Sequence, residues 1–251
     1  MMKKFLIALQ FLTIFPGGDN TAIDKDKLPQ GIVYFPLVGL FLGLVLAATN
    51  KVLSFISTDE LLANVVLVTL LIILTAGLHL DGLADTFDAL LSRKKRGEML
   101  QIMRDSHIGT MGVLSLICIL LFKVSLLCSL AQQVLNISLV LMCLLSRYSL
   151  VLAMFLFPYI REEGKAKVFV EGMNRRRLFL ATVISLSCAF IVFGLKGLFT
   201  LFAAGLFVLL TGRFIAGKIG GMTGDTLGAI NELTETFVLL TVLILIRING
   251  I

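Results

Sequence analysis

The sequence predicts an all-α, polytopic membrane protein: a transmembrane helical bundle of about seven spans plus a short N-terminal helix that is interfacial or re-entrant. Of its 251 residues, 58% are hydrophobic and only 15% are charged, and the mean hydropathy is +1.00. A soluble domain carries about 25% charged residues. The apolar segments are continuous rather than alternating, which argues against a transmembrane β-barrel. We therefore expect residues 1–251 to form a single integral membrane domain.

The first element is a short apolar helix over residues 5–15, which follows Lys3 and Lys4. It is too short to cross a hydrocarbon core about 30 Å thick, and no small-residue cleavage site of a signal peptide follows it. We therefore expect this helix to be retained. Apolar segments long enough to span the bilayer follow at 32–49, 61–80, 110–130, 134–157, 178–194, 198–216 and 233–248.

The second of these segments is predicted to continue as one helix over residues 61–90, about 45 Å long, which is more than the bilayer requires. Its last turns, which are acidic, should therefore reach the interface or a wet cavity. The fifth and sixth segments are separated only by residues 194–197, which include two glycines and a lysine.

Lys and Arg residues set the orientation of the chain. They gather in three loops, 91–109, 158–177 and 213–218, and the loops between them carry one basic residue at most. The positive-inside rule places the basic loops in the cytoplasm. We therefore expect a multi-pass protein of the cell inner (cytoplasmic) membrane whose active site faces the cytoplasm. These loops account for the net charge of +6, so no nucleic-acid partner is predicted.

Three carboxylates lie close together where the second segment ends: Asp81, Asp85 and Asp88. At 3.6 residues per turn they fall at about 0°, 40° and −20° around a helix, so all three point the same way. Ionisable side chains at the edge of a bilayer indicate function, and like charges on one face call for a cation such as Mg²⁺. Gly82 and Ala84 leave room beside them for a neighbouring helix or a phosphate. The alternative is a helix end that simply solvates its charges.

A second candidate site lies in the basic loop before the third span, in residues 104–112. Asp105 could complete a metal site, and Arg104 or His107 could hold a phosphate oxygen. Gly109, like the glycine three residues later, permits close approach of a ligand, and N–H groups near a helix start favour an anion. The alternative is that Asp105 or Ser106 is only the N-cap of the next helix.

A third candidate site is the Gly-rich segment where the last span begins. Thr223 and Gly224 lie at its entry, where free N–H groups could bind phosphate. Relative to Asp225, Glu232 and Glu235 fall at about −20° and −80° around a helix, which makes a second acidic face on the same side of the membrane. The alternative is an Asp225 N-cap followed by exposed glutamates.

Two single residues complete the set of candidates. Arg147 lies inside the fourth span, where a lone arginine requires a carboxylate or phosphate partner, so we expect it to face the acidic cavity. His79 points away from the face of Asp81 by helical geometry. This orientation favours a packed, hydrogen-bonded histidine over a ligand-binding one.

Five short sequences combine these candidates with two others: Phe11–Pro16, Tyr34–Gly39, His79–Asp88, Arg104–Gly112 and Thr223–Glu235. In this order they resemble the cobalamin synthase family, the adenosylcobinamide-GDP ribazoletransferases. Each sequence is short, but together they extend over nearly the whole chain. Ile14 departs from the family pattern, in which many relatives have a basic residue.

The resemblance implies a membrane-bound, Mg²⁺-dependent phosphotransferase at the end of the nucleotide-loop pathway of vitamin B12 biosynthesis. Such an enzyme joins α-ribazole, or its 5′-phosphate, to adenosylcobinamide-GDP. It releases GMP and forms adenosylcobalamin, or its 5′-phosphate. The implied partners are these two substrates and the lipid bilayer, with other corrinoid-pathway enzymes as further candidates.

This chemistry agrees with the residues described above. The ribazole 3′-hydroxyl would attack the cobinamide-side phosphorus of a diphosphate, and metal ions held by Asp81, Asp85 and Asp88 would neutralise the charge that builds up. One aspartate would take the hydroxyl proton, and Asp88 is one candidate for this general base. Asp225 and Glu232 could bind a second metal ion or the nucleotide.

Three other functions remain open from the sequence. A distant likeness to the CDP-alcohol phosphotransferases suggests a phospholipid-making enzyme, although their fuller motif with a spaced glycine is not matched. A cation transporter would place its acidic residues near the bilayer midplane and often contains inverted repeats, and no repeat is evident here. A membrane scaffold for other corrinoid enzymes would tolerate the loss of Asp81.

Overall fold

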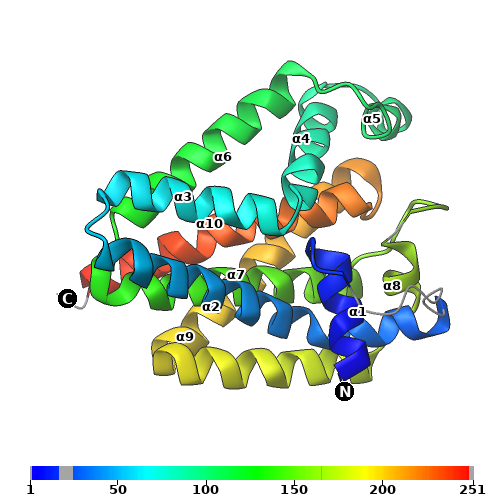
Figure 1. Cartoon of the computed structure of the whole chain (residues 1–251). Coiled ribbons are helices and arrows are strands. Elements are labelled where there is room, and N and C mark those ends of the chain that lie inside the picture. The colour runs from blue at the N-terminus through cyan, green and yellow to red at the C-terminus, as the bar shows by residue number, and fades with distance from the viewer. Residues whose placement is uncertain (1, 17–24, 165, 249–251) are drawn as a thin grey trace.

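The structure, a computed structural model, describes residues 2–16, 25–164 and 166–248. Within these ranges every regular element is helical, and the only pairing between extended segments is a single bridge from Tyr159 to Met222. The elements are α1 (Met2–Leu12), η1 (Lys25–Tyr34), α2 (Phe35–Phe55), α3 (Glu60–Leu74), α4 (Leu78–Leu91), α5 (Arg96–Ile102), α6 (Thr110–Cys128), α7 (Gln132–Leu156), α8 (Lys167–Glu171), α9 (Arg175–Ile219) and α10 (Gly224–Ile248). Figure 1 shows their arrangement.

In the described part of the chain, five helical stretches are long and apolar enough to cross a membrane, and the bent pair α3 and α4 makes a sixth if it counts as one span. Large apolar side chains also cover the outside of the bundle. On α9, for example, Ile191 is 80% exposed and Phe202 is 66% exposed. Such surfaces are stable against lipid rather than water. The prediction of an all-α, polytopic helical bundle is confirmed.

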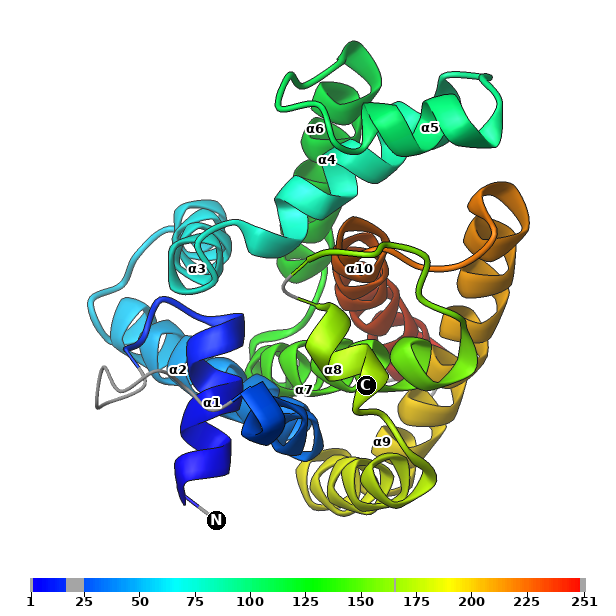
Figure 2. The same cartoon turned by 90° about the vertical axis from the view of Figure 1, so that its right-hand side faces the viewer.

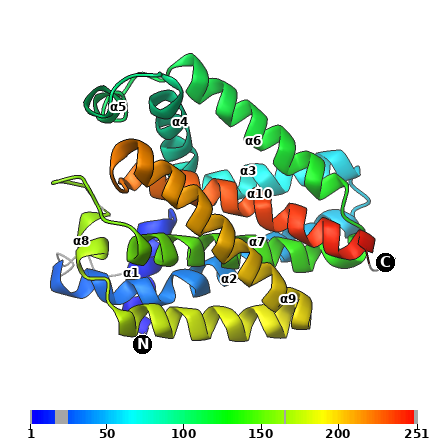
Figure 3. The same cartoon turned by 180° about the vertical axis from the view of Figure 1, so that it is seen from behind.

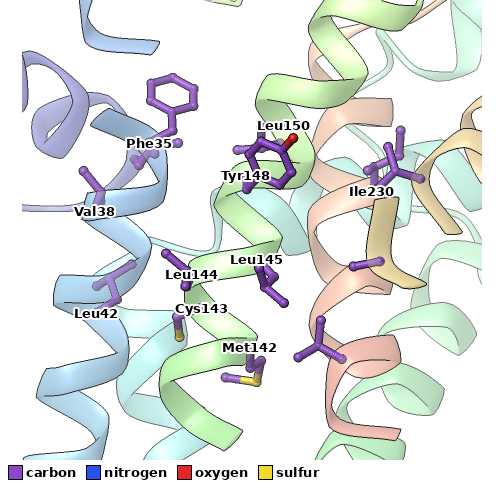
Figure 4. Close-up of a cluster of buried hydrophobic side chains, with 14 of the residues drawn as sticks. Phe35, Val38, Leu42, Met142, Cys143, Leu144, Leu145, Tyr148, Leu150 and Ile230 are labelled. Atoms are coloured by element: carbon purple, nitrogen blue, oxygen red, sulfur yellow. The ribbon is translucent and has the colours of Figure 1, made fainter. Parts of the chain in front are cut away.

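The centre of the bundle is α7, in which residues 138–151 are all buried because α2, α9 and α10 surround them. Two glycines allow α2 to approach closely. A Cβ added at Gly43 would lie 2.6 Å from the Cα of Val140, and one at Gly39 would overlap the carbonyl of Cys143. Such small residues are typical of helix contacts in membranes. The apolar side chains of this core in Figure 4 include Val38, Leu42, Leu144 and Leu145.

The prediction of one helix over residues 61–90 is wrong. The chain bends by 90° between α3 and α4, so α4 leaves α3 nearly at a right angle (Figure 1). Ala76 and Gly77 lie at the bend with φ values of 51° and 66°. Glycine adopts this left-handed conformation readily, but for alanine it is costly. Helical periodicity therefore did not predict a bend at Ala76. As a result Asp81 lies in the first turn of a new helix.

The long helix α9 consists of two arms, as Figure 3 shows. Phe193 and Gly194 are non-helical, and Gly194 has φ 59° and ψ −141°. Only glycine adopts this conformation readily. A Cβ at Gly197 would overlap the carbonyl of Ala189, so the two arms meet closely just beyond the break. The break lies where the predicted segments 178–194 and 198–216 meet, and the whole stretch counts once among the five apolar helices.

Elements distant in sequence meet at one end of the bundle: the end of α1, the start of α4, the loop after α7 and the start of α10 (Figure 2). The loop is fixed to the turn before α10, because Ile160 N donates to Met222 O at 3.0 Å and Met222 N donates to Pro158 O at 2.7 Å. Gly221 makes this possible, since a Cβ there would overlap the Pro158 carbonyl.

Candidate functional site

A cavity of about 340 Å³ lies where these four elements meet. One part of its wall is polar and carries Asp81, Tyr159, Arg161 and Asp225. Burial raises the pKa of the Tyr159 phenol above its usual range, so this side chain remains a neutral hydroxyl. The rest of the wall is mainly apolar and includes Phe11, Leu12, Leu78, Leu150, Met154 and Leu227. The cavity is therefore amphipathic.

The polar wall is organised around Arg161, which sequence reasoning treated only as part of a basic loop. Its Nη2 atom lies 2.7 Å from Asp225 Oδ2 and donates to the Met103 carbonyl at 2.9 Å. Its Nε atom is buried and has no hydrogen-bond partner within the described residues. The Arg161 and Asp225 side chains are each 18% exposed, so the pair is partly accessible from the cavity.

Contact between α4 and α10 brings the first and third candidate segments together. Gly82 faces the start of α10, where an added Cβ would lie 2.6 Å from the Asp225 carbonyl oxygen. Asp81 and Asp225 consequently line the same cavity. Asp85 is half-buried one turn further along α4, where the charges of Asp225, Asp81 and Asp88 act on it. The close approach predicted for Gly82 is confirmed, and its neighbour is a helix.

Asp88 has a different environment from Asp81. Its Oδ2 accepts a hydrogen bond from Gly109 N and its Oδ1 accepts one from Gly112 N, both at 2.7 Å. These N–H groups belong to the start of α6, so Asp88 caps that helix from another helix. The anion that the Gly109 region binds is therefore a carboxylate of the same chain. Asp88 and Gly109 do not line the cavity.

The remaining predicted residues of the second candidate segment lie on the surface. Arg104, Asp105 and His107 are all exposed, and none lines the cavity. His107 Nδ1 lies 2.6 Å from Asp105 Oδ1. The hydrogen bond from His107 lowers the pKa of the Asp105 carboxyl, and the same contact raises the pKa of the His107 imidazole. These groups therefore form a local surface pair.

At the start of α10, Thr223 and Gly224 have separate roles. Thr223 is fully buried, and its hydroxyl accepts a hydrogen bond from Thr226 N at 3.2 Å, so it caps the helix. Gly224 lines the cavity together with Asp225. The alternative of an Asp225 N-cap is not what the structure shows, because Asp225 pairs with Arg161 instead.

A buried charge network crosses the bundle next to the site. Lys123 Nζ on α6 lies 2.8 Å from Glu232 Oε2 and 2.5 Å from Glu235 Oε2 on α10. Arg147 on α7 forms an ion pair with Glu235, and Asn231 Nδ2 donates to Glu235 Oε1 at 3.2 Å. The formal charges of the two cations and two carboxylates cancel. Buried ion pairs of this kind are tolerated only when they are matched.

Arg147 and Glu232 were expected to bind substrate. They belong to this network instead and do not line the cavity. The carboxylate partner that a lone arginine requires is Glu235. Sequence reasoning did not use Lys123, although a lysine inside an apolar span was a signal for such a partner. Another missed residue is His79, which is 3% exposed and lines the cavity because the cavity lies across the first turn of α4.

The five carboxylates predicted as metal ligands are not assembled into one protein-only site. In the described ranges, no group of three or more His, Cys, Asp and Glu side chains is arranged to hold a metal ion. Asp105 is on the surface and both Asp88 oxygens are already hydrogen-bonded. Mg²⁺ commonly uses one or two carboxylates, with water and substrate phosphates completing its shell. Asp81 and Asp225, which share the cavity, fit this arrangement.

The fold and the cavity together define a polytopic helical membrane protein with a cavity lined by acidic and basic side chains at one end of its bundle. Comparison with known proteins identifies the family. The chain belongs to the cobalamin-5-phosphate synthase family, whose model matches residues 4–243. No solved structure matches the chain significantly.

Several curated relatives are similar over nearly their whole length. A protein of Desulforamulus reducens is 36% identical over 244 residues, which cover 97% of each chain. One of Escherichia coli is 36% identical over 97% of this chain and 100% of its own. One of Roseiflexus sp. is 39% identical over 93% of this chain and 87% of its own. All three are named adenosylcobinamide-GDP ribazoletransferase.

Proposed function

We propose that the protein transfers the adenosylcobinamide phosphate group from adenosylcobinamide-GDP to α-ribazole or its 5′-phosphate. GMP is released, and adenosylcobalamin or its 5′-phosphate forms. The names and full-length similarity of the relatives support this assignment. The structural observation that carries it is the meeting of Asp81, Arg161 and Asp225 in one cavity, because an arginine can stabilise the charge of a diphosphate and carboxylates can hold a cation or take a proton.

The bond changes assign roles to these side chains. The acceptor hydroxyl oxygen attacks the cobinamide-side phosphorus, the bond from that phosphorus to the oxygen of GMP breaks, and GMP leaves with the electron pair. Arg161 donates hydrogen bonds to the diphosphate oxygens, which carry the growing negative charge. Asp81 forms no ion pair with the residues that the structure describes, so it is the carboxylate free to accept the hydroxyl proton.

Mg²⁺ is part of the proposal. Asp225, and Asp81 through the oxygen that does not take the proton, would hold the ion, in agreement with the preference of Mg²⁺ for a few carboxylates and phosphate oxygens. When bound, the ion supplies positive charge to the diphosphate and the leaving oxygen. Asp85 remains close enough to influence this site electrostatically.

We also propose that the site faces the cytoplasm at the inner membrane. The cavity receives Tyr159 and Arg161 from the basic loop 158–177. Because that loop should remain on the positive-inside face, the cavity opens on the same side. The charged diphosphate donor and the polar acceptor can then reach it without crossing the bilayer.

The proposal is tested by mass spectrometry of the products formed by purified protein, Mg²⁺, adenosylcobinamide-GDP and α-ribazole, with and without EDTA. We expect a cobalamin product and GMP, both lost with EDTA. Asp81→Asn should insert in the membrane but give no product. Glu163→Gln, an exposed acid in the loop of Arg161, is the matched control and should behave as wild type.

Two outcomes would overturn the assignment. Near-normal turnover by the Asp81→Asn protein would exclude its proposed role. Conversion of CDP-diacylglycerol, or ion uptake into vesicles, without any cobalamin product would favour the phospholipid phosphotransferase or the transporter.

A further inference from the structure

We propose that the cavity is the binding site of the acceptor, a nucleoside with an apolar aromatic base, and that the corrinoid donor stays outside it and presents only its diphosphate at the opening. This inference rests on the proposed function and assigns one of its two substrates to a place in the fold. The size of the cavity and the chemistry of its wall support it.

The size of the cavity separates the two substrates. Pockets that enclose a drug-sized ligand have volumes of about 300–1,000 Å³. At about 340 Å³, this cavity is at the small end of that range. A benzimidazole joined to a ribose is a small ligand and fits such a volume. A corrin ring that carries an adenosyl group and a nucleotide is several times larger and cannot be enclosed.

The apolar wall matches an aromatic base. Phe11 is held in place by Phe169, with ring centroids 4.2 Å apart, and by Phe35 at 5.9 Å, so it forms a stiff surface. Met154 and Leu150 lie on the same cavity, and a thioether packs well against aromatic rings. A benzimidazole has few polar atoms to desolvate here, whereas the amide groups of a corrin and the edge of a guanine would lose their hydrogen bonds.

The polar end of the wall matches a ribose. His79 is 3% exposed and its Nδ1 atom has no hydrogen-bond partner within the described ranges. The unpartnered Nδ1 atom is enclosed by the protein, so the groups of this wall that can meet ribose hydroxyls are carboxylate and guanidinium groups. Asp81 and Arg161 line the same cavity. A ribose at this end brings its hydroxyl to Asp81, beside the arginine that binds the diphosphate.

The experiment measures the KM of each substrate separately. Leu78→Ala removes an apolar contact from the cavity wall, and because Leu78 is 41% exposed the fold should tolerate it. We expect the KM for ribazole to rise about tenfold, since losing a few carbon atoms from a hydrophobic pocket has effects of this size. The KM for adenosylcobinamide-GDP should stay within about twofold. Ile73→Ala, at a 55% exposed position outside the cavity wall, is the matched control and should change neither.

Equilibrium dialysis with α-ribazole alone provides a second measurement. Wild-type protein should retain the nucleoside without any donor, and Leu78→Ala should weaken this binding by the same factor. A rise in the donor KM alone, or an unchanged ribazole KM, would overturn the inference. Because dialysis needs no turnover, its result is independent of whether the wild-type protein makes a cobalamin product, which tests the proposed function itself.

Discussion

Arg161 Nη2 lies 2.7 Å from Asp225 Oδ2, and this ion pair joins the loop after α7 to the first turn of α10 inside the cavity wall. The pairing holds a guanidinium in the cavity wall, and its buried Nε atom has no hydrogen-bond partner in the described part of the chain. Arginine can bind two oxygens at once, so a phosphate can bind here while Asp225 keeps the side chain in place.

Arg161→Gln should reduce kcat/KM for adenosylcobinamide-GDP by about 100-fold, because the loss of one charged donor at a reacting oxyanion typically has this effect. Arg161→Lys should recover only part of it, since an ammonium lacks the planar pair of donors. Steady-state kinetics with the donor varied provide the measurement. Arg176→Gln, at an exposed basic position, should be neutral. Equal loss in both proteins would mean that only general surface charge matters.

Gly82→Ala should abolish activity while the protein still inserts in the membrane. The new Cβ would lie 2.6 Å from the carbonyl oxygen and 2.8 Å from the Cα of Asp225, so α4 and α10 must separate and Asp81 must move. Gly97→Ala on α5 is the matched control, because an added Cβ there meets nothing within 4 Å. Product formation by the two purified proteins is compared. An active Gly82→Ala protein would show that the site tolerates displacement of these helices.

Lys123→Met should destabilise the protein by about 3–5 kcal/mol, because it leaves Glu232 buried without its cation. Glu235 keeps Arg147 as a partner, so the loss should be confined to one carboxylate. The double variant with Glu232→Gln should therefore recover most of the stability. Thermal unfolding of the purified proteins in one detergent provides the comparison. No recovery in the double variant would mean that Lys123 stabilises the fold through another contact.

Asp88→Ala should lower stability by about 1–2 kcal/mol, because two N–H groups at the start of α6 lose their acceptor. Asp88→Asn should lose less, since an amide oxygen still accepts one of these hydrogen bonds. Asp59→Ala, which removes a cap with one hydrogen bond at α3, is the control and should have a smaller effect. Unfolding in detergent measures all three. If Asp88→Ala were as stable as wild type, the capping role would be excluded.

Helical periodicity predicted that the three aspartates share one face of a helix, but it did not distinguish their roles. Asp81, Asp85 and Asp88 all lie on α4, yet Asp81 faces the cavity while Asp88 caps α6. The difference arises from what packs against each turn of the helix, and this is a property of α6 and α10 rather than of α4. For the same reason His79 was expected to point away from the site, whereas the cavity reaches it across the end of the helix.

The amino-acid sequence by itself determined that this protein is a helical membrane bundle, where most of its apolar segments lie and which three segments carry its polar chemistry. Hydropathy and charge are properties of neighbouring residues in the sequence, so they predict spans and loops without any knowledge of tertiary contacts. Only the tertiary structure decided that Arg161 meets Asp225, and that Lys123 pairs with Glu232, 109 residues further along the chain. The first pair relies on the close contact of Gly221 with Pro158, and the place of Asp81 beside it relies on the left-handed bend at Ala76, features that neither hydropathy nor periodicity predicts.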